Sequence, residues 1–462
     1  PAPRCASNRS RPRRAERGSP PTVPPSNPFP GLDPPSVARA LAAIADQPDD
    51  AAEVYFERRA ELELPPYDAG PGLRERCEEG LAARLVRGRR AWSASRDRLG
   101  TRELAEALRQ VARALPAAAP SPELELAPFR APAPRAELLA FPPALERALR
   151  RRHVAFPLRV ATRWHRRDLL VVGARWSARP EREAFFSVDV DLPWGRAGAL
   201  ETRLDGEAAE RLAAALVLRF RARDASPPAT GRPPLLLAPA AAAVVLHEGV
   251  AHALEADLLA LAGRPEAAIG RQLGPAGVDV LDDPSRAPVG VERATDDEGL
   301  PVERRWLLRA GRVEQPLADA RAARDSALLA PGSGFRAHRH APPRPRTHHL
   351  ELLPGEAGLD ALLALSEGGL LVSELDAGRL DPWTGELVLH APCARRVRGG
   401  EAAEPVGPFT VVGRIAELLG GIVAVGREVE VAGAGWCAKA GERRAVWATV
   451  PHVVVAGLEV RP

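Results

Sequence analysis

The stretch that decides the fold of this chain is Pro239-Ala-Ala-Ala-Ala-Val-Val-Leu-His247-Glu248-Gly-Val-Ala-His252-Ala-Leu-Glu255-Ala-Asp257-Leu-Leu-Ala-Leu-Ala-Gly263. It is rich in alanine and leucine, begins at a proline and ends at a glycine, which are the start and stop signals of a helix. Its largely apolar character predicts burial, yet it carries two histidines and three carboxylates. Burying such groups is costly unless they are paired, and a metal ion is a partner that could serve both histidines.

The spacing of the two histidines predicts a distorted helix. His247 and His252 are five residues apart, whereas the common zinc helix separates its histidines by four. At about 100° per residue, four steps leave two side chains roughly 40° apart and five steps roughly 140° apart. A π-bulge, or a break after the first turn, would bring both imidazoles to one ion, and Gly249 would ease the distortion.

Glu248 lies beside the first histidine and is the natural general base of such a site. It would take a proton from a metal-bound water, whose pKa falls to about 7 on zinc. The alternative interpretation is a core helix with two incidental histidines, because such pairs also arise by chance.

The composition argues against nucleic-acid binding. Alanine, arginine, proline and leucine dominate, methionine is absent, and Lys439 is the only lysine, which is typical of a GC-rich genome. The net charge is +4, but residues 1–20 hold six arginines and one glutamate, which leaves the rest of the chain at −1. The sequence therefore predicts a basic tail on a nearly neutral body.

The sequence also predicts a cytoplasmic protein. It has no uncharged run of about 18 apolar residues that could span a membrane, and its arginine-rich start has no apolar secretory segment. Four cysteines in 462 residues do not make a disulfide framework, and a reducing compartment fits best.

We expect an α+β fold, with N-terminal α/β-type domain(s) followed by a strand-rich C-terminal domain that carries the His-Glu-x-x-x-His helix. Proline-rich segments at 116–134 and 221–234 mark the boundaries. The predicted divisions are a disordered basic tail at 1–32, an N-terminal α+β domain at 33–115, a central α+β domain at 135–222 and a C-terminal domain at 235–462.

A catalytic zinc site usually has three protein ligands plus water, so a third ligand is needed. Cys437 lies in a glycine-rich segment whose backbone could approach a metal closely, and a thiolate is a strong zinc ligand; a free cysteine is otherwise most often a small buried hydrophobe. The other candidates are Glu255, Asp257 and the histidines His338, His340, His348 and His349. Either helix carboxylate could instead orient a ligand imidazole.

Three blocks together resemble the TldD/PmbA family of metallopeptidases. They are the helix motif from His247 to Asp257, the run Asp296-Asp-Glu-Gly299, and Gly435-Trp-Cys437-Ala-Lys439-Ala-Gly441-Glu. The resemblance implies that residues 235–462 form the metallopeptidase domain, that His247, His252 and Cys437 bind Zn²⁺, and that Glu248 is the catalytic base. Two positions depart from the family pattern, because Ala251 and Ala438 stand where glycine is usual.

The same resemblance implies further properties. Family members act on unfolded or short peptides, and they form homodimers or heterodimers with a motif-less paralogue; we expect no nucleic-acid or membrane partner. It also makes Arg344, Arg346 and His348 candidates for substrate contacts.

We expect the carboxylates of Asp296, Asp297 and Glu298 to lie in a solvated turn. The competing functions are a non-catalytic scaffold subunit and a hydrolase of a non-peptide amide.

Overall fold

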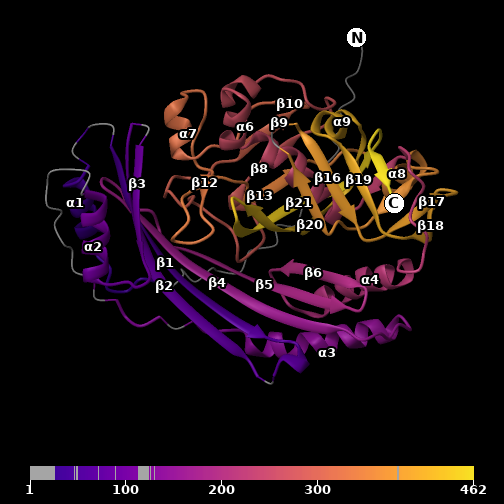
Figure 1. Ribbon diagram of the computed structural model, residues 1–462, viewed down its shortest axis with the longest axis horizontal. Coiled ribbons are helices and arrows are strands. Elements are labelled where there is room, and N and C mark those ends of the chain that lie inside the picture. Colours follow the sequence, from indigo (N-terminus) through magenta and orange to yellow (C-terminus); the bar gives the residue numbers. More distant parts are fainter. Residues whose placement is uncertain are drawn as a thin grey trace, which may run out of the picture.

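The structure is a computed structural model that describes residues 27–462 except 46, 48, 49, 71, 89, 113–123, 125, 130, 382 and 383. It confirms the predicted α+β class, with helices and strands in both halves of the chain (Figure 1). Most of the predicted tail, residues 1–26, lies outside the described residues. Phe29 and Leu32, at the end of that predicted tail, are buried in a hydrophobic core. Within the described part, no helix is both long and apolar enough to cross a membrane.

The N-terminal half forms an antiparallel sheet with the strand order β3-β2-β1-β4-β5-β6. The strands are β1 (Ala51–Leu64), β2 (Arg74–Arg87), β3 (Arg90–Arg96), β4 (Arg159–Gly173), β5 (Glu181–Leu192) and β6 (Gly195–Glu201). Strand β1 pairs with β4 from Glu53 opposite Gly173 to Leu64 opposite Thr162. Strands of the predicted 33–115 and 135–222 domains therefore share one sheet, and the division at those boundaries stays a prediction.

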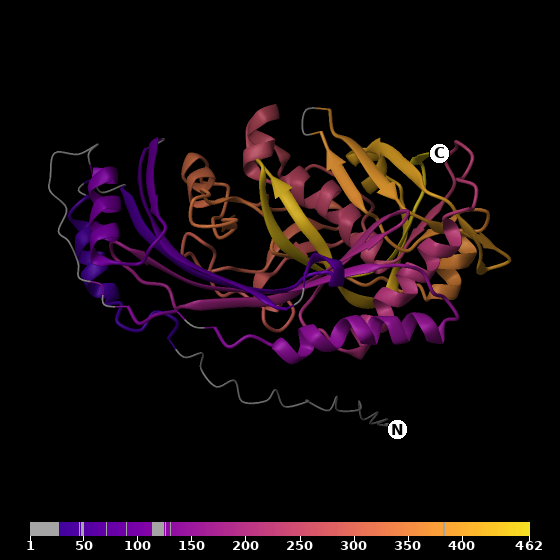
Figure 2. The same cartoon turned by 60° about the horizontal axis from the view of Figure 1, so that its bottom comes forward.

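One face of this sheet is covered by helices. They are α1 (Pro34–Ala42), α2 (Thr101–Ala112), α3 (Arg135–Arg151) and α4 (Gly206–Ala222). Helices α1 and α2 pack on one end of the sheet with Val54 and Phe56, and α3 and α4 pack on the other end with Ala60 and Leu62. These residues of β1 alternate along the strand and so share a face. Figure 2 shows both helix pairs on the curved sheet.

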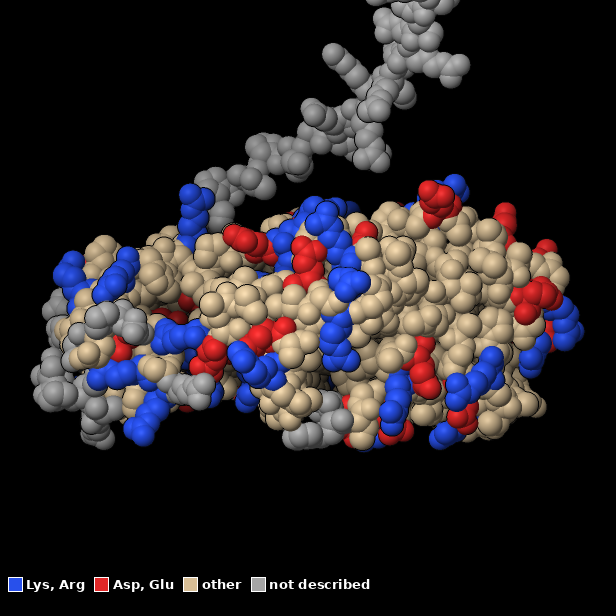
Figure 3. Space-filling model, turned by 90° about the horizontal axis from the view of Figure 1, so that it is seen from above, with Lys and Arg blue, Asp and Glu red and all other residues tan. Residues whose placement is uncertain are grey.

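The opposite face of the sheet lies against the C-terminal half, which Figure 1 shows as orange and yellow ribbons above the long N-terminal strands. Here β1 presents Glu53, Tyr55 and Glu57, all buried. Because both faces of β1 are covered, most of its side chains are buried, and the face toward the C-terminal half carries two buried carboxylates. On the molecular surface drawn in Figure 3, basic and acidic side chains lie side by side, in keeping with the nearly neutral body.

The C-terminal half contains two main sheets. The larger has the order β10-β9-β8-β13-β21-β7-β14-β17-β18, with β20 paired to β21, and the smaller has the order β15-β16-β19-β22; β11 pairs with β12 separately. The strands of the larger sheet are β7 (Leu235–Leu237), β8 (Val280–Asp282), β9 (Arg305–Arg309), β10 (Arg312–Val313), β13 (His349–Leu352), β14 (Leu370–Val372), β17 (Ala394–Arg398), β18 (Glu401–Val406), β20 (Ile422–Lys439) and β21 (Glu442–Val455). The others are β11 (Gly334–Phe335), β12 (Arg344–Pro345), β15 (Ala377–Leu380), β16 (Glu386–Ala391), β19 (Phe409–Arg414) and β22 (Glu459–Arg461).

Helix α5 (Pro239–Leu246) is central to the core of this half. Its side chains Ala242 and Leu246 belong to one cluster with Val453 of the larger sheet and Leu389 of the smaller. The remaining helices are α6 (Ala256–Ala262), α7 (Ala320–Asp325), α8 (Leu359–Leu365) and α9 (Ile415–Gly420). The first part of the predicted apolar helix is therefore buried, as its composition indicates, whereas in its last part, α6, only Ala256 is buried and Leu261 is exposed.

Candidate metal centre

The helix that carries the two histidines is distorted where the spacing predicts it. Regular α-helix ends at Leu246, residues His247–Ala251 form a π turn, and His252–Leu254 form a 3-10 turn. The backbone N–H of His252 donates to the carbonyl of His247, five residues back. The π turn absorbs one extra residue and brings the two imidazoles to the same side.

Gly249 has a different role from the one expected of it. Its backbone is not in the left-handed region, so the π turn does not depend on the conformational freedom of glycine. A Cβ at this position would lie 2.4 Å from Cδ2 of Leu418 in α9. The glycine therefore allows α9 to pack closely against the π turn.

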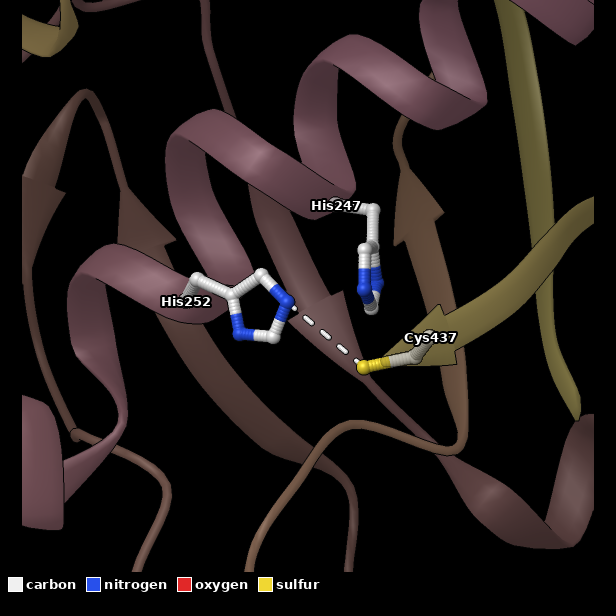
Figure 4. Close-up of side chains that lie close together, drawn as sticks. All are labelled: His247, His252 and Cys437. Carbon is white, nitrogen blue, oxygen red and sulfur yellow. Dashed lines mark hydrogen bonds between the residues drawn. The ribbon is translucent and has the colours of Figure 1, made fainter. Parts of the chain in front are cut away.

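The structure brings His247, His252 and Cys437 together (Figure 4). Each offers a ligand atom, and these atoms all lie within 4.8 Å of one another. The two imidazole centroids are 4.6 Å apart, and Sγ of Cys437 is 3.5 Å from Nε2 of His252. Cys437 comes from β20, 185 residues further along the chain than His252. Among the described residues, no other group of three such side chains has the geometry of a metal site.

The chemistry of these three residues fits a zinc ion. Both ring nitrogens of His247 are buried without a hydrogen-bond partner in the described structure, and a buried polar group in that state is costly. Burial would raise the pKa of the Cys437 thiol, but the imidazoles of His247 and His252 lower it to about 6. Two imidazoles and a thiol of lowered pKa are a donor set that zinc prefers in proteins.

A carboxylate orients the second histidine. Nδ1 of His252 lies 2.7 Å from Oε2 of Glu255, which leaves Nε2 facing Cys437. Burial would raise the pKa of Glu255, but His252 and Lys439 lower it to about 2. Asp257 accepts a hydrogen bond from Lys439. Of the two candidate orienting carboxylates, Glu255 is the one in place.

Glu248 lines a cavity of about 610 Å³ that His252 also lines. Its side chain is partly exposed, and the same cavity is lined by Trp436, next to Cys437. The carboxylate can therefore reach solvent in the cavity, as a proton acceptor must.

Two of the candidate substrate contacts have protein partners instead. Arg346 is buried, and its Nη1 donates to Sγ of Cys437 at 3.7 Å while Nη2 donates to the carbonyl of Lys439. His348 is buried against the carbonyl of Val291 and the guanidinium of Arg444. Neither lines the cavity of Glu248. The contact of Arg346 with Cys437 could not be found from the sequence, since nothing local pairs the two residues.

The other histidines of that region also have protein partners. His340 lies 2.8 Å from both Ser95 and Asp97 of the N-terminal half. His349 contacts Thr449 of β21 at 2.9 Å. These contacts join the segment around His340 to the N-terminal half, and β13 to β21.

The expectation that Asp296, Asp297 and Glu298 lie in a solvated turn is wrong. The turn is present, with Gly299 at φ 75°, but all three carboxylates are buried. They are paired inside the protein: Asp297 accepts from Arg167 and Arg293, and Glu298 accepts from Arg84. Arg84 and Arg167 come from distant strands, whereas Arg293 is only four residues from Asp297 in the sequence. Without the two distant arginines the local sequence did not reveal the burial.

The chain is similar to known metalloproteases. Residues 230–462 match the family model described as the PmbA/TldA metallopeptidase C-terminal domain. A metalloprotease of Methanothermobacter thermautotrophicus is 30% identical over 231 residues, 50% of each chain. A metalloprotease TldD homolog of Buchnera aphidicola is 25% identical over 266 residues, 56% of this chain and 53% of that one. The matched part of the chain thus spans about half the length of these relatives.

A solved structure has a similar fold. The crystal structure of TldE from Thermococcus kodakarensis superposes with a TM-score of 0.69 over 90% of this chain and 97% of that one, at 18% identity. At this identity the likeness shows the fold alone. Because the family model matches half of the chain, and that half contains all three converging side chains, this chain belongs to the TldD/PmbA family of metallopeptidases.

Proposed function

We propose that this protein is a zinc-dependent peptidase that hydrolyses unfolded or short peptides with low sequence specificity. One observation carries the proposal: three buried side chains, one from the π turn, one from the 3-10 turn that follows it and one from β20, bring their ligand atoms within 4.8 Å of one another. His247, His252 and Cys437 would hold the ion. The unpartnered ring nitrogens of His247 support this, because a bound cation would satisfy one of them.

The reaction would depend on Glu248. Zinc supplies Lewis acidity that polarises a carbonyl oxygen and makes water more acidic. The Glu248 carboxylate takes a proton from the attacking water and passes it to the leaving amine of the peptide bond. Its place on the cavity wall next to His252 supports this role.

The walls of the cavity favour recognition of the peptide main chain. Strand β15 is the end of the smaller sheet, and β20 pairs only with β21 among the described strands. Residues of both strands, including Gly378 and Gly435, line the cavity of Glu248. An edge strand has free backbone groups that can pair with an extended peptide, and such pairing depends little on side chains. Low sequence specificity follows.

We further propose that the protein works in the cytoplasm as a homodimer or with a motif-less paralogue. The described cysteines Cys77, Cys393 and Cys437 are all free thiols, which fits a reducing compartment. The convergence of three donor side chains favours a catalytic subunit over a scaffold, since a scaffold would need no such site.

Replacing Cys437 by serine tests the metal site. We expect about one zinc per chain in the wild type. Cys437→Ser should lose most of this zinc and should also lose peptide hydrolysis, because two imidazoles alone do not make a catalytic zinc site. The measurement is metal analysis of the purified proteins beside an assay on an unstructured peptide. Cys77→Ser, at an exposed cysteine of β2, is the matched control and should keep both. Equal zinc in the wild type and Cys437→Ser would contradict the ligand assignment.

Replacing Gly378 by alanine tests the position of Glu248. A Cβ at Gly378 would lie 2.5 Å from Cγ of Glu248, so the methyl group should push the carboxylate aside. We expect kcat to fall by roughly 10- to 100-fold, since a misplacement of about 1 Å can cost that much, with the zinc content unchanged. Gly277→Ala, in open space, should leave kcat as in the wild type. A Gly378→Ala enzyme with unchanged kcat would show that Glu248 needs no precise position.

A further inference from the structure

The single lysine of this chain lies next to the candidate metal centre. The chain has 64 lysine and arginine residues, and Lys439 is the only lysine among them. It is buried, two residues beyond Cys437 on the same strand and the same face, while Ala438 between them is exposed. Because all the remaining lysine and arginine positions of the chain hold arginine, a buried lysine at this place indicates that an ammonium group is required.

The contacts of Lys439 explain that requirement. Its Nζ donates to Oε2 of Glu255 at 2.9 Å, to Oδ1 of Asp257 at 2.7 Å and to the carbonyl of Pro345 at 2.7 Å. These three acceptors use all three N–H groups of an ammonium ion. They converge on one atom, which suits a compact point charge, whereas a guanidinium spreads its donors over a planar fork.

One of these contacts leads directly to a candidate zinc ligand. Oε2 of Glu255 accepts from Lys439 and also lies 2.7 Å from Nδ1 of His252. The other oxygen of Glu255, Oε1, is buried without a hydrogen-bond partner in the described structure. Glu255 itself has extended backbone at the break between the 3-10 turn and α6. Among the residues that the structure describes, Lys439 is thus the one partner of the carboxylate besides the imidazole that it orients.

We propose that Lys439 is a positioning residue of the metal centre: it holds the Glu255 carboxylate in place, and Glu255 in turn fixes the ring of His252. This inference rests on the proposed function, since it assumes that His252 binds the ion. One end of β20 then supplies both a ligand, Cys437, and the support for a second ligand, His252. A chain of two hydrogen bonds couples the strand to the broken helix.

The test measures zinc affinity directly, by competition with a chelator, in Lys439→Arg and Lys439→Met. We expect both variants to bind zinc about 10- to 100-fold more weakly than the wild type, the usual effect of losing a group that orients a ligand. Lys439→Arg should bind zinc weakly although it keeps the positive charge. The cobalt-substituted variants should also show changed d–d absorption bands, because the geometry around His252 is altered. Arg427→Met, exposed on the same strand, is the control and should match the wild type.

Glu255→Gln separates positioning from a merely structural role. If Lys439 acts through Glu255, then Glu255→Gln should weaken zinc binding to a similar extent, and the double variant with Lys439→Met should bind no more weakly than Glu255→Gln alone. Wild-type zinc affinity and cobalt bands in Lys439→Arg would overturn the inference, and so would fully additive losses in the double variant. Lowered thermal stability of the metal-free Lys439→Met protein with unchanged zinc affinity would also overturn it. A wild type that binds no zinc would instead refute the proposed function.

Discussion

Replacing Glu248 by glutamine should abolish peptide hydrolysis while the zinc stays bound. Glutamine has nearly the same size as glutamate but cannot accept a proton from water, and a positioned general base contributes roughly 10²- to 10⁴-fold to a rate. Glu248 is not one of the three converging donors, so its substitution should leave the metal content unchanged. The measurement is kcat on an unstructured peptide, with metal analysis of the same preparation.

The control for this prediction is Glu430→Gln, at an exposed position of β20, which should hydrolyse the peptide as the wild type does. Near-normal turnover by Glu248→Gln would show that another group activates the water. Loss of turnover together with loss of zinc would mean that Glu248 helps to hold the ion, and the assignment as base would then fail.

Replacing Arg293 by methionine should cause a large loss of stability. The Arg293 guanidinium is fully buried and joins the two halves of the molecule: it lies 2.5 Å from Glu181 and 2.9 Å from Glu183 of β5, and 2.8 Å from Asp297. Methionine would leave these carboxylates buried without that partner. Breaking a buried ion pair from one side costs about 3–5 kcal/mol, so we expect a decrease of that order in the free energy of unfolding, measured by denaturant titration.

Arg196→Met is the matched control. Arg196 pairs with Asp191 at 3.0 Å on the β5–β6 hairpin, but its side chain is 87% exposed. Exposed pairs contribute little because water screens them, so this variant should unfold as the wild type does. Equal stability of the two variants would mean that the charged interface between the N-terminal sheet and the C-terminal half does not hold the molecule together.

Features that depend on neighbouring residues could be predicted from the sequence. The five-residue spacing of His247 and His252 predicted a distorted helix, and the π turn is present, because the direction of each side chain follows from the few residues around it. The buried position of α5 followed from its apolar composition in the same way, although α6, which is equally apolar, is largely not buried.

Features that depend on distant partners could not be predicted. Asp297 and its neighbours have the composition of a solvated turn, yet they are buried, and Arg167 of β4 and Arg84 of β2 pair with Asp297 and Glu298. Likewise, no local signal indicated that Arg346 contacts Cys437 or that Lys439 supports Glu255. Cys437 was identified as a ligand only through the resemblance to a family, since its segment alone is compatible with an ordinary buried cysteine.

By itself, the sequence determined the kinds of side chain available for the site and the local distortion that turns two imidazoles to one side. The packing of the whole chain brings the thiol of Cys437, 185 residues beyond His252, against them, and it places Lys439 of the same strand against Glu255, which orients His252. The reason is physical: helix geometry is set within a turn or two of chain. The place of Cys437 depends instead on how β20 pairs with β21 and on how that sheet packs against α5.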